Sequence, residues 1–222
     1  MSIKENLQAL HKDIEKISNN WDRPARDITL VAVSKKQPED RIDAALAAGH
    51  RVYGENRVQE ARKRWEHRRP EFPDLRLHLI GPLQTNKAGD AVALFDVIES
   101  LDRPKLARKL AREMDSQDRH LPCLIQVNTG KEDQKSGVLP ADFPDLLKCA
   151  REECGLTITG LMCIPPLDDP PGLHFAFLKD LADRHDLTQL SMGMSGDYEM
   201  AIAAGATFIR VGTGVFGPRP ES

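Results

Sequence analysis

The chain has 222 residues, of which 40% are apolar and 29% charged, and its formal net charge is −3. This is the composition of an ordinary globular protein, and it excludes a disordered, collagen-like or disulfide-stapled chain. Because a general nucleic-acid-binding protein would be basic, and because no apolar run approaches the roughly 18 residues of a membrane-spanning helix, we expect neither nucleic-acid nor membrane partners.

The N-terminal segment predicts an amphipathic helix over about residues 3–19. Its apolar residues recur at helical spacing, at Ile3, Leu7, Leu10, Ile14 and Ile17. This stripe is typical of a helix that packs on a core, and the charged residues between the apolar ones argue against a signal peptide. We therefore expect residues 1–20 to pack against a single domain that covers residues 1–222.

Eight short runs rich in Val, Ile and Leu follow, and helical stretches separate them. The runs are residues 28–33, 51–53, 75–80, 95–98, 121–127, 157–162, 189–192 and 207–211. The helical stretches are residues 39–48, 57–67, 86–94, 103–116, 141–153, 198–204 and a weaker one at 168–186. Such alternation predicts a parallel sheet, and eight units fit a closed (β/α)8 TIM barrel near its lower size limit. A doubly wound open sheet is the alternative.

The four cysteines predict neither a disulfide framework nor a metal site. They form no Cys-x-x-Cys pair and have no histidines at zinc-ligand spacing. Free thiols in a reducing cytoplasm are the simplest interpretation.

Chemistry in a barrel lies at the carboxyl ends of its strands, where polar and glycine-rich turns follow several of these runs. Ser34-Lys35-Lys36 follows the first run, and a partly desolvated lysine there could attack a carbonyl. The two-residue period of a strand does not decide which lysine points inward. Asn56, after the second run, either caps a helix or reaches a ligand. The polar stretch from His78 to Lys87, after the third run, is either a turn or part of a site.

The ends of the last two runs predict a phosphate site. Ser195 follows the seventh run, and Gly212 and Thr213 follow the eighth. Glycines allow a close approach of the backbone, and these two strand ends commonly hold phosphate in barrels. A lysine and a phosphate site together suggest a phosphorylated aldehyde held as a Schiff base, either pyridoxal 5′-phosphate (PLP) or the sugar phosphate of a class I aldolase. Arg210 would keep the pyridine nitrogen of PLP unprotonated.

The same segments, in this order and spacing, resemble the YggS/PROSC family of PLP homeostasis proteins from about residue 5 to residue 218. The resemblance rests on Val31-Ala32-Val33-Ser34-Lys35, Gly54-Glu55-Asn56, His78 to Lys87, Lys135-Ser136-Gly137, Gly160-Leu161-Met162, Leu190 to Ser195 and Arg210-Val211-Gly212-Thr213. Leu77 and Leu79 stand where the family usually has an aromatic residue and Phe or Met.

This resemblance implies a fold-type III barrel like the N-terminal domain of alanine racemase. It implies that Lys35 forms the internal aldimine with PLP, that Ser195, Gly212 and Thr213 lie near the phosphate, and that Arg210 lies by the pyridine nitrogen. Asn56, His78 and Met162 would line the cofactor, and Lys135 matches a lysine linked to cofactor handling.

We expect a PLP carrier rather than an enzyme, with no catalytic residue. In alanine racemases a second acid–base group is a tyrosine from a partner subunit, whereas this chain has only Tyr53 and Tyr198 and leaves no length for a further domain. The expected role is to hold PLP as a monomer, limit the free aldehyde and deliver it to apo-enzymes. The alternatives are a racemase of narrow substrate range, an aldolase-like barrel, and a nucleic-acid module resting on the basic run 62–69.

Overall fold

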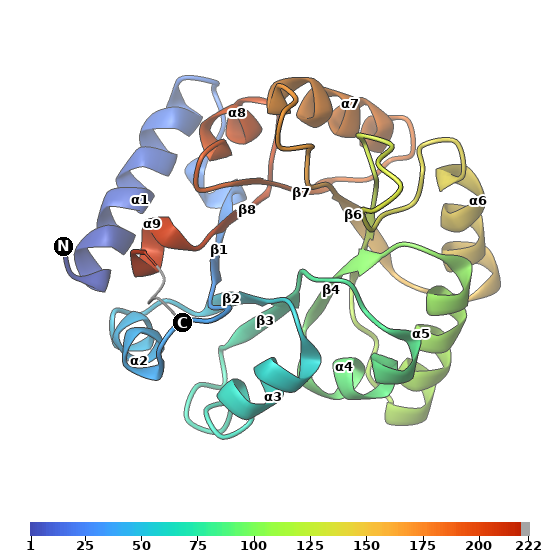
Figure 1. Ribbon diagram of the computed structural model, residues 1–222, viewed down its shortest axis with the longest axis horizontal. Helices are drawn as coiled ribbons and strands as arrows, with labels where there is room; N and C mark the ends of the chain where they lie inside the picture. Colours follow the sequence, from blue (N-terminus) through green and yellow to red (C-terminus); the bar gives the residue numbers. More distant parts are fainter. Residues whose placement is uncertain (219–222) are drawn as a thin grey trace.

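The strands close into a barrel in sequence order, as the computed structural model of residues 1–218 shows (Figure 1). Residues 219–222, the end of the expected 1–222 domain, lie outside the described part. The strands are β1 (Thr29–Val33), β2 (Val52–Glu55), β3 (Arg76–Leu79), β4 (Val97–Leu101), β5 (Cys123–Gln126), β6 (Ile158–Met162), β7 (Gln189–Met194) and β8 (Phe208–Val211). All neighbours are parallel, and β1 pairs with β8 from Thr29↔Phe208 to Ala32↔Val211. This last pairing closes the sheet, so the open-sheet alternative is wrong.

Helices surround the barrel on its outside. They are α1 (Ile3–Asn19), α2 (Glu39–Ala47), α3 (Val58–Trp65), α4 (Ala88–Leu94), α5 (Pro104–Gln117), α6 (Phe143–Lys148), α7 (Pro171–Asp183), α8 (Tyr198–Ala203) and α9 (Thr213–Phe216), with 3-10 turns at Ala25–Asp27 and Thr85–Lys87 and a π-helical turn at Cys149–Glu153. The weak stretch 168–186 forms α7, which begins on Pro171, where a missing N–H costs nothing. Gly49 and Gly205 follow α2 and α8 with φ of +89° and +104°, as expected of residues that end helices.

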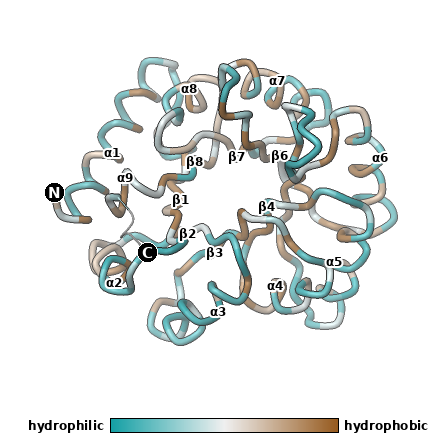
Figure 2. Tube along the Cα trace, in the orientation of Figure 1, coloured by the Kyte–Doolittle hydropathy of each residue, from teal (hydrophilic) through white to brown (hydrophobic). Residues whose placement is uncertain are grey.

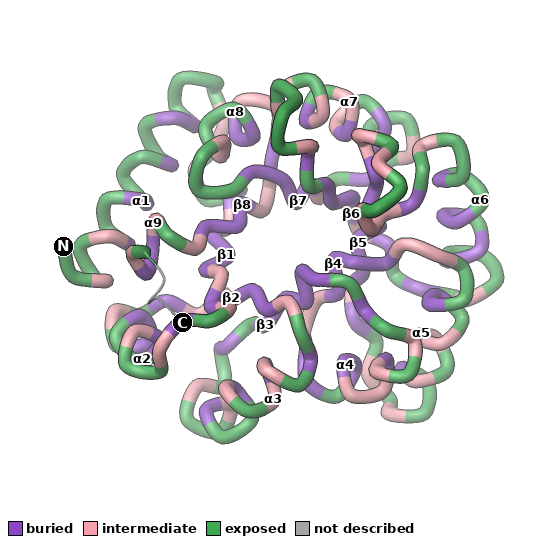
Figure 3. The backbone as a smooth tube through the Cα atoms, in the orientation of Figure 1, coloured by how far each residue is buried: buried purple, intermediate pink, exposed green. Residues whose placement is uncertain are grey.

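Each strand turns alternate residues toward the helices and toward the barrel interior. Leu30, Ala32, Leu77, Leu79, Leu161, Cys163, Leu190, Met192, Ile209 and Val211 belong to the apolar core. The residues between them on the same strands therefore face the opposite way, into the barrel. Figure 3 shows that the strands are almost wholly buried, and Figure 2 shows their apolar character against the more polar outer helices. The inward residues include the apolar Val31 and Met162 and the polar His78, Ser191 and Arg210.

The N-terminal helix joins the two ends of the chain. Ser2 caps α1 by accepting from the Glu5 amide, while the Glu5 carboxylate accepts from the Ser2 amide, a reciprocal arrangement that satisfies two free donors. The predicted stripe is buried from Leu7 to Ile17. Asn6 donates to the carbonyl of Val215 in α9 over 2.9 Å. The helix therefore packs on the barrel beside its closing strand.

Candidate cofactor-binding site at the barrel mouth

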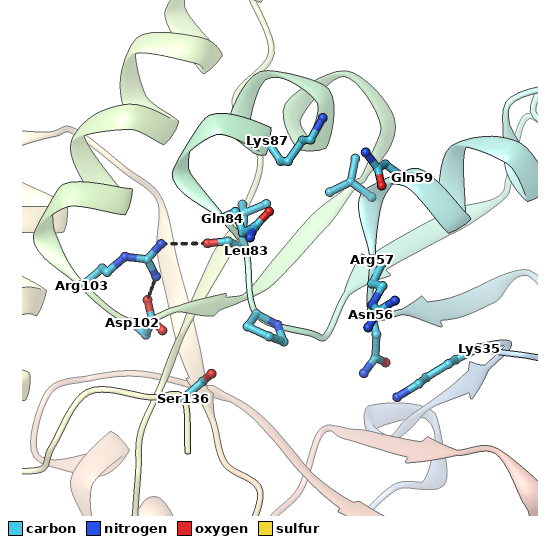
Figure 4. A pocket seen from close by; sticks show the side chains of 12 residues that line it. Lys35, Asn56, Arg57, Gln59, Leu83, Gln84, Lys87, Asp102, Arg103 and Ser136 are labelled. Carbon is cyan, nitrogen blue, oxygen red and sulfur yellow. Dashed lines mark hydrogen bonds and ion pairs between the residues drawn. The ribbon is translucent and has the colours of Figure 1, made fainter. Parts of the chain in front are cut away.

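A cavity of about 770 Å³ opens at the carboxyl ends of the strands, on the side of β1 to β4. Its lining is mostly polar and includes four cationic side chains, and Figure 4 shows these side chains around the opening. They are Lys35, Asn56, Arg57, Val58, Gln59, Pro82, Leu83, Gln84, Lys87, Asp102, Arg103 and Ser136. Four cations against one carboxylate favour an anionic ligand, and the volume lies within the usual range of about 300–1,000 Å³ for small-molecule sites.

Lys35, and not Lys36, extends into this cavity. Lys35 is half-buried and lies beside Asn56 in the lining (Figure 4). Lys36 is exposed and has a φ of +57°, a conformation that is uncommon outside turns for a residue with a side chain. The structure thus separates two lysines that the sequence pattern left equivalent.

The turn that carries Lys35 is held by a buried carboxylate on β2. Glu55 is fully buried and points outward from the barrel toward α3. Its Oε1 accepts from Ser34 Oγ over 2.6 Å, from Arg64 Nη1 over 2.8 Å and from Trp65 Nε1 over 3.0 Å. Ser34 immediately precedes Lys35, so the Glu55 carboxylate binds the residue next to the cavity lysine.

A second buried carboxylate, Glu99 on β4, lies inside the barrel. Its Oε1 accepts from His78 Nδ1 over 2.6 Å, and its Oε2 accepts from the Ser191 hydroxyl. Arg210 Nη1 donates to the Ser191 oxygen over 2.6 Å, and Nη2 donates to the carbonyl of Cys163 over 2.8 Å. The chain of hydrogen bonds from His78 to Arg210 therefore fixes the floor beneath the mouth.

Charge stabilises this interior carboxylate in its ionised form. Burial acts to raise the pKa of Glu99, but the hydrogen bonds from His78 and Ser191 and the nearby Arg210 guanidinium lower that pKa overall. The site thus has a fixed cation, Arg210, whose orientation is set by neutral and anionic partners on three other strands.

The predicted phosphate-binding residues lie at the open ends of β7 and β8. Ser195 and Thr213 are exposed, and Gly212 is half-buried. A Cβ on Gly214 would lie 2.7 Å from Val211 Cγ1, so this turn requires glycine. α9 starts at Thr213, and the N–H groups of Val215 and Phe216 donate to the carbonyl of Gly212 over 3.1 and 2.9 Å. None of the three predicted residues lines the β1–β4 cavity.

The remaining predicted residues are Met162 and Lys135. Met162 is fully buried at the end of β6, on the inward-facing side of the strand. Lys135 does not line the cavity, because its Nζ pairs with Glu132 at 2.6 Å and donates to the carbonyl of Pro165 at 3.3 Å. The loop from β5 that carries Lys135 nevertheless reaches the cavity through Ser136.

Three residues of these hydrogen-bond networks, Glu55, Glu99 and Ser191, are not among the site residues predicted from the sequence. Glu99 is not among the predicted site residues because the sequence pattern predicts a fourth strand that ends at residue 98, whereas β4 continues to Leu101. Glu55 and Ser191 enter the sequence analysis only as parts of the motif segments Gly54-Glu55-Asn56 and Leu190 to Ser195. A usable signal existed for Glu99: a carboxylate inside an apolar strand is almost never buried without partners.

The basic run 62–69 is matched by carboxylates. Arg62 pairs with Asp90, Arg64 with Glu39 and Glu55, Arg68 with Glu39 and Asp43, and Arg69 with Asp96. These arginines hold α3 to its neighbours, so the run does not form a free cationic surface of the kind that binds phosphate backbones.

Comparison with known proteins decides the family. The family described as alanine racemase, N-terminal domain, matches residues 6–220. The PLP homeostasis protein of Vibrio alginolyticus is 38% identical over 231 residues, which cover 100% of this chain and 99% of that protein. The chain belongs to the family of PLP homeostasis proteins. Another member, from Escherichia coli strain K12, is 35% identical over 99% of this chain and 98% of its own length.

The solved structures agree with this family and with the fold. PipY of Synechococcus elongatus PCC7942, with PLP bound, has a TM-score of 0.83 and 39% identity, and the match covers 97% of this chain and 100% of PipY. An alanine racemase of Clostridium difficile 630 has a TM-score of 0.74 at 13% identity, over 100% of this chain and 58% of the racemase. The latter likeness concerns the fold alone: a TIM barrel like the alanine racemase N-terminal domain.

Two further properties of residues 1–218 complete the description. None of their helices combines the length and apolar character needed to cross a bilayer. Their His, Cys, Asp and Glu side chains form no group of three with the geometry of a metal site.

Proposed function

We propose that this chain binds PLP covalently through Lys35, holds it in a PLP homeostasis role and delivers it to apo-enzymes without robust catalysis of its own. The observation that carries this proposal is the placement of the Lys35 amine inside a cationic cavity at the barrel mouth. The family membership and the PLP bound to PipY support it.

The residues at the mouth fit PLP. When bound, PLP supplies an aldehyde that condenses with a lysine amine, and a dianionic phosphate. Lys35 is the amine, and the excess of cations in the lining suits an anion. At the β7–β8 end, a Cβ on Gly196 would meet no atom within 4 Å, so the backbone beside Ser195 is open to a phosphate.

The other predicted residues orient the ligand in this proposal. Asn56 lines the cavity beside Lys35, and His78 and Met162 face the interior below it. The permanently charged guanidinium of Arg210 is held by Ser191 and Cys163, and in this proposal it would lie by the pyridine nitrogen. Because guanidinium does not give up its proton, it would keep that nitrogen unprotonated and restrain carbanion chemistry.

The two tyrosines support a carrier rather than a racemase. The Tyr53 hydroxyl donates to the carbonyl of His50 on the helix-facing side of the barrel, and burial raises its pKa. The Tyr198 hydroxyl donates to Asp13 of α1. Neither lines the cavity, so neither is placed to act as a second acid–base group.

The test is the absorbance of the purified protein mixed with PLP, followed by borohydride reduction and peptide mass analysis. We expect a yellow protein whose adduct lies on Lys35. Lys35→Ala should lose the adduct, and the neighbouring Lys36→Ala is the matched control that should keep it. A protein that remains colourless with PLP would contradict the proposal.

The carrier role needs two further measurements. We expect no racemisation of alanine above background and transfer of PLP to an added apo-enzyme; robust turnover that Lys35→Ala abolishes would establish the racemase alternative instead. We further propose that the chain acts in the cytoplasm as a monomer, to be measured by fractionation and by light scattering.

A further inference from the structure

The burial of the Glu55 carboxylate is unfavourable for the stability of this fold. It is fully buried, and while its Oε1 accepts three hydrogen bonds, its Oε2 is buried and has no hydrogen-bond partner among residues 1–218. A buried carboxylate with an unpartnered oxygen costs free energy, and ion pairs of this kind seldom raise stability over apolar packing. Stability alone therefore does not account for Glu55, and its neighbours indicate what it does.

The three donors to Glu55 join two strand ends and a helix. Ser34 is the residue before Lys35, and Glu55 is the residue before Asn56, so one hydrogen bond of 2.6 Å ties together the ends of β1 and β2 that deliver two cavity residues. The Ser34 amide also donates to the carbonyl of Gly54 over 3.2 Å. The positions of Lys35 and Asn56 are thus set relative to each other.

Arg64 of α3 closes the other side of the turn. Its Nη1 donates to the carbonyl of Ser34 over 2.7 Å and to Glu55, and its Nη2 donates to the carbonyl of Gln37 over 2.9 Å. These carbonyls stand on either side of Lys35 and Lys36. A guanidinium, whose donors form a fixed fork, can hold both at once, whereas an ammonium is a single point.

We infer that Glu55, Arg64 and Ser34 form a positioning clamp that presents Lys35, and not Lys36, to an aldehyde at the cavity. The clamp fixes the turn so that Lys36 takes the φ of +57° and points to solvent. This inference rests on the proposed function of Lys35. Its physical basis is that an amine displaced from the reactive geometry reacts more slowly, and a displacement of about 1 Å can lower the rate roughly a hundredfold.

The experiment measures where PLP becomes attached. Wild type and Arg64→Met are incubated with PLP and reduced with borohydride, and the adducts on Lys35 and Lys36 are quantified by peptide mass, with the Kd from absorbance. We expect Arg64→Met to bind PLP roughly tenfold or more weakly and to move a measurable share of the adduct to Lys36. Arg64→Lys should recover thermal stability but not the preference for Lys35, because it cannot span both carbonyls.

Arg69→Met is the matched control for lost stability. Arg69 holds the turn that follows α3 through Asp96 and the carbonyl of Leu94, and its side chain makes no hydrogen bond to the Lys35 turn. It should lower the melting temperature and leave the adduct on Lys35. If Arg64→Met does not fold, Ser34→Ala, which removes only the hydroxyl, gives the same comparison.

The outcomes separate the two hypotheses. A folded variant that lacks the clamp, yet keeps wild-type affinity and the wild-type ratio of the adducts, overturns the clamp while the function at Lys35 stands. Absence of any adduct in wild type overturns the proposed function, and the clamp with it.

Discussion

Two carboxylates are fully buried in this barrel, Glu55 on β2 and Glu99 on β4, and their hydrogen bonds differ. Glu99 points inward, and each of its oxygens accepts a hydrogen bond, from His78 and from Ser191. Glu55 points outward, with one oxygen accepting three hydrogen bonds and the other none. The difference separates a group that completes an interior network from one that fixes the position of a neighbouring turn.

The two environments also differ in the state of the nearby arginine once the carboxylate is removed. Without Glu99, Arg210 would keep its charge inside the barrel, 3% exposed. Without Glu55, Arg64 would still reach Glu39 and two carbonyls near the surface. We therefore expect removal of the interior carboxylate to cost more.

The largest effect should follow removal of Glu99. Glu99→Ala leaves the His78 and Ser191 donors without their acceptor and removes the negative charge that lies near the buried Arg210 guanidinium, and leaving a buried charge uncompensated costs about 3–5 kcal/mol of unfolding free energy. Urea unfolding followed by circular dichroism measures it. The double variant Glu99→Ala/Arg210→Met should recover part of the loss, and equal stability of Glu99→Ala and wild type would refute the network.

Acid should act first through His50 and then through Glu99. Burial lowers the pKa of His50 to about 4. As the pH falls, the unfolded chain protonates His50 near pH 6.5, whereas the folded chain does so only near pH 4. The free energy of unfolding should therefore decrease by about 1.4 kcal/mol for each pH unit of acidification from pH 6.5 to pH 4. His50→Gln should remove this slope.

The contribution of Glu99 is lost in a lower pH range than that of His50. Because the folded pKa of Glu99 is lowered, its stabilisation is present above its unfolded pKa of about 4.3 and is lost as pH falls through the folded value. Urea midpoints measured from pH 7 to pH 3 in the His50→Gln background should therefore converge with those of His50→Gln/Glu99→Gln only in acid. A constant gap across this range would contradict the assignment.

Amide substitution should distinguish the two carboxylates more finely. In Glu99→Gln, either placement of the amide nitrogen faces a donor, from His78 or from Ser191. In Glu55→Gln the nitrogen can occupy the Oε2 position, which faces no hydrogen-bond donor. We expect a loss of about 2–3 kcal/mol for Glu99→Gln and about 1 kcal/mol for Glu55→Gln. Equal losses in urea unfolding would remove the distinction.

The smallest effect on stability is expected at Gly212, away from both carboxylates. A Cβ there would lie 3.6 Å from the Val33 carbonyl oxygen, an ordinary contact, so Gly212→Ala should change the unfolding free energy by less than about 0.5 kcal/mol while weakening PLP binding severalfold. Gly193→Ala is the contrasting variant: φ is +89° and the Cβ would lie 2.5 Å from Ala201 Cβ. A stability loss at Gly212 as large as at Gly193 would contradict this view.

The barrel could be predicted from the sequence because its signals are local. Apolar runs alternate with helical stretches, and glycines such as Gly49 and Gly205 mark where helices end. The cavity residues Lys35 and Asn56 were found because strand ends in a barrel share one rim.

The sequence indicates that Glu99, inside an apolar strand, needs a partner, but the partners and roles of both carboxylates could not be predicted because they depend on tertiary contacts. Glu55 acquires its role only when α3 brings Arg64 against the β1 turn, 30 residues from Ser34. Glu99 acquires its role only when β4 and β7 face each other across the interior, 92 residues apart at Ser191. The charges of Arg64 and its neighbours look like those of a solvated helix until their partners are in place.

The pairing of β1 with β8 has a consequence for how the chain folds. During synthesis β1 emerges early, and its outer edge has no partner until β8 has left the ribosome, more than 170 residues later. Arg23, just before β1, donates to the carbonyls of Ile202, Gly205 and Ala206 near the other end of the chain. Contacts this distant in sequence slow folding and expose an unpaired strand edge meanwhile. The nascent chain therefore depends on residues 202–211 to protect its first strand from aggregation.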